Sequence, residues 1–336
     1  MKLQLNSRQK KAIQCTDRPL LVLAGAGSGK TRVITEKIAH LIRKGEYQPK
    51  HIAALTFTNK AAREMKQRLE KSGLECDGLR VSTFHRLGLD ILRREYRQLG
   101  YRKSFTLYDG QDSASLVQEL MRKTGLQAFE QAQAIHWQIS SWKNGAVSPE
   151  QAYADATDEK QLAAARLYLQ YSHYLHTYNA FDFDDLISRP LQLFSEHQDT
   201  LEKWRDRIRY LLVDEYQDTN TSQYQLLQLL VGNRNGLTVV GDDDQSIYGW
   251  RGAQSDNLDR LKQDYKGLEV VLLEQNYRST ATILNAANAL IANNSSRMGK
   301  NLWTEGGDGD LIRIYSAYNE RDEADFIIGR LRDWSD

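Results

Sequence analysis

The chain has 336 residues, which is long for one hydrophobic core and predicts at least two domains. Its 26% charged and 40% hydrophobic residues are ordinary for a soluble globular protein. The formal net charge of +1 provides no overall basic field, so binding to nucleic acid or to an anionic membrane would have to depend on a local patch.

Short apolar runs recur along the chain, and each is followed by polar residues and then by a helical pattern. Continuous runs of this kind are typical of buried parallel strands. Together they predict an α/β fold with a mostly parallel sheet, helices on both faces and ligands at the carboxyl ends of the strands. The runs are LLVLA (20–24), IAALTF (52–57), LRVSTF (79–84), RYLLVDE (209–215), LTVVGD (237–242) and LEVVLLE (268–274).

The first strand leads into LLVLAGAGSGKT (20–31), which resembles a Walker A P-loop except that Ala24 replaces its first glycine. Such a loop closes backbone N–H groups around phosphate oxygens at a helix N-terminus. Lys30 is then expected to bridge the β- and γ-phosphates of ATP, and the Thr31 hydroxyl to bind Mg²⁺. A chance GKT in a glycine-rich turn is the alternative, but strand and helix flank the loop correctly. The expected phosphate cradle is Ala24, Gly25, Ala26, Gly27, Ser28 and Gly29.

The next two strands end in TFTNKAAREM (56–65) and STFHRLG (82–88), which combine aromatic and polar residues. Aromatic faces stack bases, and polar or cationic groups contact the nucleic-acid backbone. The stretch 60–103 carries 12 Lys and Arg against 6 Asp and Glu, which is a local basic excess, although a solvated helix face explains much of it equally well. The candidate nucleic-acid contacts are Phe57, Thr58, Asn59, Lys60, Thr83 and His85.

Residues 88–187 contain one helical pattern after another and predict a helical domain inserted into the α/β core. Tyr168, Tyr171, Leu175 and Tyr178 share one helical face, which predicts packing into a local core rather than base stacking.

The strand in YLLVDEYQD (210–218) delivers Asp214 and Glu215 to its carboxyl end. Asp214 suits the Mg²⁺ shell, and Glu215 is placed to deprotonate an attacking water. An acidic pair after a strand is often only a solvated turn. Its pairing with a P-loop predicts ATP hydrolysis rather than nucleotide binding alone.

The segment VVGDDDQSIYGWRGA (239–253) joins two chemistries in one loop. Gln245 is expected to contact the γ-phosphate or the attacking water, and Asp242 and Asp243 are candidates to extend the metal and water network. Asp244 fits a solvated turn equally well. The following Tyr248, Trp250 and Arg251 are expected to bind single-stranded nucleic acid, with burial in a core as the alternative for both aromatics.

A further unit begins after Asn276. RSTATILNAANALIANN (278–294) predicts a helix, LIRIYSA (311–317) a strand, and the last residues an amphipathic helix. One strand and two helices cannot bury a sheet, so we expect the chain to end inside a domain.

Cys15 and Cys76 are far apart and outside any metal-ligand spacing, which indicates thiols in a reducing cytosol. The N-terminus has no apolar signal-peptide region, and no apolar run approaches the ~18 residues of a membrane span. We therefore expect a cytoplasmic protein with no membrane partner.

As an ordered set, the motifs resemble the UvrD/Rep/PcrA group of superfamily 1 DNA helicases over essentially the whole chain. RYLLVDEYQDTNTSQY and the inserted region are most similar to the Rep branch, and NALIANNSSRMGKNLWTEG to the UvrD branch. The motifs are LNSRQ (5–9), AGAGSGKT (24–31), LTFTNKAAREM (55–65), STFHRLG (82–88), FDFDDL (181–186), LLVDEYQDTN (211–220), VVGDDDQSIYGWRGA (239–253) and LEQNYRS (273–279).

The resemblance implies further roles. Gln9 would contact the adenine edge, Tyr277 would stack on adenine, Arg278 would reach the γ-phosphate as an arginine finger, and Arg32 would line the nucleotide pocket. Phe57, His85, Tyr248 and Trp250 would lie along the single-strand path.

The resemblance also implies a RecA-like core domain formed by residues 1–87 and 188–275, the inserted helical domain at 88–187, and the start of a second RecA-like domain at 276–336. In this group the two core domains close on ATP and open after hydrolysis, which moves the protein 3′→5′ along one strand. The implied partners are single-stranded DNA, junctions with duplex, and replication or repair proteins, with the protein a monomer or dimer.

Two further motifs of the group, including a second arginine finger, do not occur before Asp336. We therefore expect this chain, taken alone, to bind ATP weakly and to hydrolyse it slowly or not at all. Two other functions stay open at this point. One is the motor subunit of a recombination helicase–nuclease, and the other is a nucleotide-gated DNA-binding protein that does not translocate.

Overall fold

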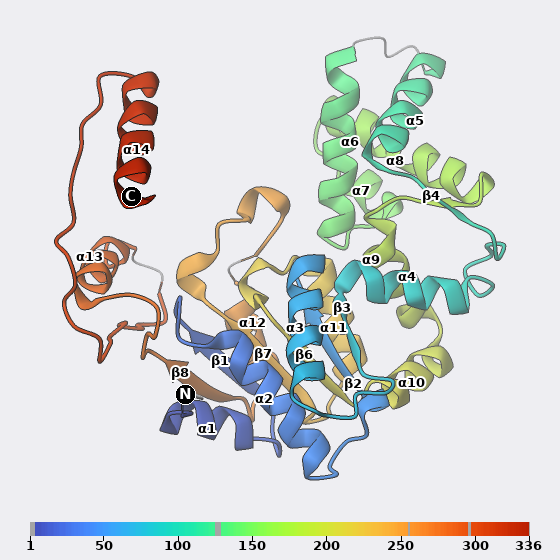
Figure 1. The fold of residues 1–336 in the computed structure, drawn as a ribbon. Coiled ribbons are helices and arrows are strands. Elements are labelled where there is room, and N and C mark those ends of the chain that lie inside the picture. The colour runs from blue at the N-terminus through green and yellow to red at the C-terminus, as the bar shows by residue number, and fades with distance from the viewer. Residues whose placement is uncertain (1–3, 125–128, 255, 295–296, 336) are drawn as a thin grey trace.

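The computed structural model describes residues 4–124, 129–254, 256–294 and 297–335. Its centre is a six-stranded sheet with the order β3-β2-β6-β7-β1-β8, and every neighbouring pair is parallel (Figure 1). All six predicted strands are confirmed: β1 (Leu20–Ala24), β2 (Ile52–Thr56), β3 (Arg80–Thr83), β6 (Tyr210–Val213), β7 (Leu237–Gly241) and β8 (Glu269–Leu273).

The sheet is buried on both faces, which explains why its strands are continuous apolar runs. Leu21, Leu23 and Val239 point into one core, whereas Leu20 and Val22 point into the other. The second core is covered by α1 (Ser7–Gln14), α2 (Lys30–Arg43) and α3 (Asn59–Lys71). The first is covered by α4 (Phe84–Glu95), α9 (Asp185–Glu196), α10 (Gln198–Arg207), α11 (Thr221–Val231) and α12 (Asn257–Asp264).

A separate helical body stands to one side of the sheet, at the upper right of Figure 1. Its own core lies between its helices, and a short parallel pair of strands lies at its base. Helices α4 and α9 connect it to the sheet and cross so closely that a Cβ on Gly88 would collide with the Leu186 carbonyl. The body consists of β4 (Thr106–Leu107), α5 (Gly110–Lys123), α6 (Phe129–Asn144), α7 (Pro149–Ala154), α8 (Glu159–Thr177) and β5 (Ala180–Phe181).

The predicted packing face on α8 is right for three residues and wrong for the fourth. Tyr168, Tyr171 and Leu175 are buried in the helical body, but Tyr178 is 47% exposed. The helix ends at Thr177, so Tyr178 no longer follows the helical direction of the others. The limits 88 and 187 of the inserted domain stay a prediction. Leu87, just before the first limit, and Ile187, at the second limit, both pack into the sheet's core.

The last part of the chain leaves the sheet after β8, and Figure 1 shows α13 and α14 apart from it on the left. The two predicted helices are confirmed as α13 (Ala281–Ile291) and α14 (Glu320–Ser335). The predicted strand at 311–317 is wrong, because within the described residues no strand pairs with it. An extended segment without a neighbour cannot complete a ladder of hydrogen bonds. Leu311 and Ile314 are 85% and 94% exposed accordingly.

Short 3₁₀ turns complete the fold. Three of them follow the carboxyl ends of β6 and β7, where the polar motifs lie. The turns are η1 (Pro49–His51), η2 (Tyr216–Asp218), η3 (Asp243–Gln245) and η4 (Gly249–Arg251). Because all six strands run in parallel, the loops after them meet at one edge of the sheet.

Candidate functional site

The glycine-rich loop connects the end of β1 to the first residue of α2, as predicted. Gly27 and Gly29 have φ angles of 69° and 91°, which favour glycine. The Ser28 hydroxyl donates to the Gly25 carbonyl at 2.7 Å and closes the loop on itself. Lys30, Thr31 and Arg32 follow in the first turn of α2. The loop therefore presents the N-terminus of a buried helix, where backbone N–H groups favour an anion.

The side chain of Gln9 is bonded to this loop and does not point into solvent. Its side-chain amide donates to the Ser28 carbonyl at 3.0 Å, and its Oε1 accepts from the Asn6 N–H at 3.1 Å as part of the cap of α1. Only 1% of Gln9 is exposed. Its place beside the P-loop agrees with a nucleotide site, and its amide already has protein partners on both ends.

The acidic pair lies at the end of β6 and faces the P-loop lysine. The Nζ atom of Lys30 is 3.4 Å from Oε2 of Glu215. Glu215 has a left-handed backbone at φ 50° and ψ 46°, a conformation that costs a non-glycine residue ~1–3 kcal/mol and recurs at functional sites. The turn at Glu215 lets its N–H donate to Oδ1 of Asp214 at 3.0 Å.

Asp214 is a buried carboxyl group at the end of β6, with 7% of the residue exposed. Burial, helped by the neighbouring charge of Glu215, raises the pKa of Asp214 to about 7. A divalent cation would relieve this cost, so the buried carboxyl fits a metal-binding role.

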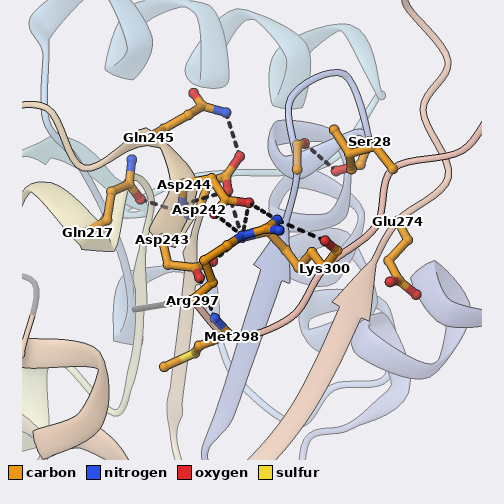
Figure 2. A network of polar contacts seen from close by, with 12 residues as sticks. Ser28, Gln217, Asp242, Asp243, Asp244, Gln245, Glu274, Arg297, Met298 and Lys300 are labelled. Atoms are coloured by element: carbon orange, nitrogen blue, oxygen red, sulfur yellow. Dashed lines mark hydrogen bonds and ion pairs between the residues drawn. The ribbon is translucent and has the colours of Figure 1, made fainter. Parts of the chain in front are cut away.

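Gln245 joins the same site through Asp242. Its side-chain amide donates to Oδ2 of Asp242 at 2.5 Å, and the same oxygen is 3.9 Å from Nζ of Lys30. Gln217, which the sequence analysis did not single out, links the two acidic loops. Its amide donates to Oε2 of Glu215 at 2.9 Å, and its Oε1 accepts from the Asp242 N–H at 2.9 Å. Lys30, Glu215 and Gln245 are thus connected through Asp242 and Gln217. Figure 2 shows Gln217, Asp242 and Gln245 side by side.

The three consecutive aspartates after β7 are paired with cations from residues beyond α13, as Figure 2 shows. Asp242, Asp243 and Asp244 lie close enough together to hold a metal ion. Instead, Nζ of Lys300 lies 2.8 Å from Asp242, contacts Asp243 and lies 3.4 Å from Asp244. Asp244, for which a solvated turn was open, forms two bonds of 2.9 Å with Arg297.

Residues 276–278 lie directly on the P-loop. Asn276 donates to the Ala26 carbonyl at 2.6 Å, and the Tyr277 N–H donates to the Gly27 carbonyl at 3.0 Å. A Cβ on Gly27 would meet both Asn276 and Arg278, so only glycine allows this approach. Tyr277 and Arg278, which the family resemblance assigns to the nucleotide site, are therefore placed beside it. Asn276 was not predicted as a site residue, although it lies in the LEQNYRS motif.

The aromatic candidates gather at the same edge of the sheet, further toward the helical body. The rings of Phe57 and Tyr248 stack at 5.4 Å, and Tyr248 is 6.3 Å from Trp250. Trp250 is 74% exposed, which argues against the core alternative for it. The Arg251 side chain lies outside the described residues.

A cavity of about 430 Å³ lies between the core and the helical body. His85 stacks on Phe183 at 4.1 Å in its wall, and burial lowers the pKa of His85 to about 4, so its imidazole is neutral at pH 7. Phe183 is 60% exposed and was not predicted as a contact, although it lies in the FDFDDL motif. Phe57, Thr58, Asn59 and Thr83 also line the cavity.

The polar candidates beside these rings also have structural tasks. The hydroxyl groups of Thr58 and Thr83 cap α3 and α4 by accepting from the N–H groups of Ala61 and Arg86. Lys60 lies exposed on the first turn of α3. Because Thr58 and Thr83 also line the cavity, the N-termini of two helices lie at its wall, and helix N-termini favour anions.

A parallel sheet with a P-loop after β1 and an acidic pair after β6 defines the α/β core of a RecA-like P-loop NTPase. Among helices in the described part of the chain, none has the length and apolar content that crossing a bilayer requires.

Comparison with known sequences identifies the family. Residues 5–266 match the model of the UvrD/REP helicase N-terminal domain, and residues 271–336 match that of the UvrD-like helicase C-terminal domain. The chain belongs to the UvrD/REP helicase family.

Its relatives include proteins named ATP-dependent DNA helicase Rep and ATP-dependent DNA helicase PcrA. The Rep proteins of Escherichia coli strain K12 and Salmonella typhimurium strain LT2 are each 52% identical to it over 333 residues, which is 98% of this chain and 49% of theirs. PcrA of Staphylococcus aureus strain Mu50 is 44% identical over 327 residues, 96% of this chain and 45% of that protein. The chain thus spans about half the length of these relatives.

The raised pKa of Asp214 predicts a pH-dependent stability difference. Between the ordinary carboxyl pKa of 3.8 and the folded value of about 7, the unfolded state releases the proton first, so stability is lost as pH rises. Asp214→Asn removes this loss. Without nucleotide or divalent metal, the variant should match the parent near pH 4 and exceed it above pH 7 by up to about 4 kcal/mol.

Urea unfolding of both proteins at a series of pH values measures this difference. Asp218→Asn is the matched control, because Asp218 also has a pKa raised to about 6 but should show a smaller gain. A constant gap between the parent and Asp214→Asn at every pH would contradict the burial of an ionising carboxyl at this position.

Proposed function

We propose that the protein is an ATP-dependent DNA helicase and translocase that moves 3′→5′ on single-stranded DNA in replication restart or repair. The observation that carries this proposal is one loop, 242–251. Its start contacts the lysine of the P-loop through Asp242, and its end carries the exposed Trp250. Relatives with the printed name ATP-dependent DNA helicase, about half of whose length this chain spans, support the same activity.

In this proposal the P-loop residues 24–29 cradle the phosphates of ATP, with Lys30 on the β- and γ-phosphates. Bound Mg²⁺ would neutralise charge on these phosphates, with Thr31 and Asp214 as its protein ligands. Glu215 orients and deprotonates the attacking water, since its carboxylate lies 3.4 Å from Lys30 and accepts a hydrogen bond from Gln217. The left-handed turn and this bond hold it in place before the substrate arrives.

The remaining contacts with the nucleotide come from three other segments. Gln245 senses the γ-phosphate, and Gln9 and Tyr277 flank the adenine. Arg278 supplies a positive charge to the transferring phosphoryl group. The support for Arg278 is its position, since its backbone N–H donates to Asn276, whose amide in turn holds the P-loop. Arg32 lines the pocket from α2.

Single-stranded DNA would run across the aromatic groups at the same edge. Trp250, Tyr248 and Phe57 offer faces for bases, and Phe183 with His85 offers a second stack. The helix N-termini at Thr58 and Thr83, with Asn59, Lys60 and Arg251, would contact phosphates. His85 acts as a neutral stacking or hydrogen-bonding group, because its pKa of about 4 leaves it uncharged.

The protein would act in the cytoplasm at junctions between single and double strands, as a monomer or dimer, with replication or repair proteins as partners. The described cysteines support a reducing compartment, since both are free thiols. A nucleotide-gated DNA-binding protein that does not translocate is the less favoured function, because the proposed base Glu215 lies beside the P-loop lysine at 3.4 Å.

Replacing Glu215 with Gln should separate ATP binding from hydrolysis. The amide keeps the shape of the side chain but cannot accept a proton, so phosphate release should fall ~10²–10⁴-fold. Single-turnover hydrolysis with protein in excess detects even slow chemistry, and a fluorescent ATP analogue measures binding. Glu70→Gln is the control, since Glu70 is exposed on α3. Unchanged phosphate release in Glu215→Gln would exclude the proposed base.

Replacing Trp250 with Ala should weaken binding to single-stranded DNA. Loss of one stacked base costs ~1–3 kcal/mol, or about 5- to 150-fold in affinity. Fluorescence anisotropy with a labelled oligothymidine at fixed salt measures the change. Trp137→Ala is a matched control, because Trp137 is 66% exposed on α6 in the helical body. Equal affinities of the two variants would show that Trp250 does not contact DNA.

A further inference from the structure

The segment 297–302, which we call the return segment, brings the chain back from α13 to the aspartates after β7 (Figure 2). Arg297 pairs with Asp244, the Met298 N–H donates to Asp243 at 2.8 Å, and Lys300 reaches Asp242 at 2.8 Å. Three consecutive carboxylates are thus each held by a different residue of one short segment.

Lys300 carries the central charge of this contact. Only 1% of its side chain is exposed, and three carboxylates surround its ammonium group. Burial disfavours the charged form, but Asp242 and Asp243 outweigh it and the pKa of Lys300 is raised. The ammonium therefore stays charged, and a buried carboxylate cluster that lost it would keep an unbalanced negative charge.

Asp242 shares its carboxylate between this contact and the candidate nucleotide site. Its Oδ1 is paired with Lys300, while its Oδ2 accepts from Gln245 and lies 3.9 Å from Lys30. The backbone N–H of Asp242 also donates to the side-chain oxygen of Gln217, whose amide in turn donates to Glu215. A change at the phosphate position therefore alters the partners of the oxygen next to the Lys300 pair.

The other end of the return segment is fixed to the last part of the chain. Leu302 exchanges two hydrogen bonds with the side chain of Asn288 on α13, at 2.8 and 3.1 Å. Its side chain also packs on Gly25 so closely that a Cβ there would collide with it. The return segment thus connects α13 with both the P-loop and the aspartates.

We propose that Lys300 is a positioning residue that transmits the state of the nucleotide site from Asp242 to the return segment and α13. The inference rests on the proposed function. A bound triphosphate draws Lys30 and Gln245 toward itself, which leaves Lys300 as the principal cation on Asp242. Their ion pair then strengthens and the return segment becomes more rigid, so the Lys300–Asp242 pair links ATP binding to the position of the second domain.

Hydrogen–deuterium exchange of this chain, with and without a non-hydrolysable ATP analogue and Mg²⁺, tests the proposal. In the parent, exchange should slow at least threefold both in residues 25–31 and in residues 297–302. In Lys300→Met the P-loop should still slow, but residues 297–302 should no longer respond. Lys300→Arg should keep the response. Lys262→Met is the control, because Lys262 pairs with Asp259 on the surface.

The Arg297→Met variant tests whether the Lys300–Asp242 pair transmits the state of the nucleotide site or only attaches the return segment to the aspartates. It loosens the same segment but leaves the Lys300–Asp242 pair intact, so nucleotide should still slow exchange at residues 297–302. If Lys300→Met does not fold, Lys300→Gln replaces it and is interpreted in the same way. The proposal is overturned if Lys300→Met or Lys300→Gln keeps the full slowing of exchange at residues 297–302 with nucleotide. It is also overturned if Arg297→Met loses this slowing to the same extent.

Exchange in the parent protein also distinguishes failure of the Lys300 proposal from failure of the proposed nucleotide site. A P-loop that slows while residues 297–302 do not change would overturn this inference and leave the proposed nucleotide site standing. A P-loop that does not respond to saturating nucleotide would overturn both.

Discussion

The arrangement of both sites depends on the parallel direction of all six strands. Because every strand ends at the same edge, loops that are as far apart in sequence as residues 25 and 250 lie at that edge. β7 and β1 are neighbours in the sheet, so the aspartate loop lies beside the P-loop by register alone. The same edge continues over β2 and β3 to the aromatic rings. The parallel direction of the strands thus places the proposed phosphate site and the proposed base-stacking surface next to each other.

Charge balance determines how these loops are held. The edge concentrates carboxylates, and Lys30, Lys300 and Arg297 form ion pairs with them. Each lysine approaches Asp242 from a different part of the chain, one from α2 and one from the return segment. A site built in this way is sensitive to an incoming anion or cation, because a new charge changes the partners of a shared carboxylate.

The sequence predicts those parts of the structure that have a local pattern. The six strands, the P-loop and the acidic pair each combine an apolar run with a short polar motif, and hydrophobic burial on both faces leaves such runs few alternatives. The strand at 311–317 failed for the opposite reason, because its local pattern is right but no neighbouring strand lies beside it in the described chain. Four residues were missed because a large part of their role comes from contacts between segments distant in sequence: Gln217, Asn276, Phe183 and Lys300. Asn276, for example, reaches Ala26 over 250 positions.

The central claim is that one loop joins a triphosphate site to a single-strand site, so the two ligands influence each other's affinity. The most direct test is the affinity of this chain for single-stranded DNA with and without a non-hydrolysable ATP analogue and Mg²⁺, at fixed salt. The account predicts a change of ~5-fold or more, with the reciprocal change in nucleotide affinity when DNA is present. Equal DNA affinities, under conditions where the analogue is independently seen to be bound, would contradict it.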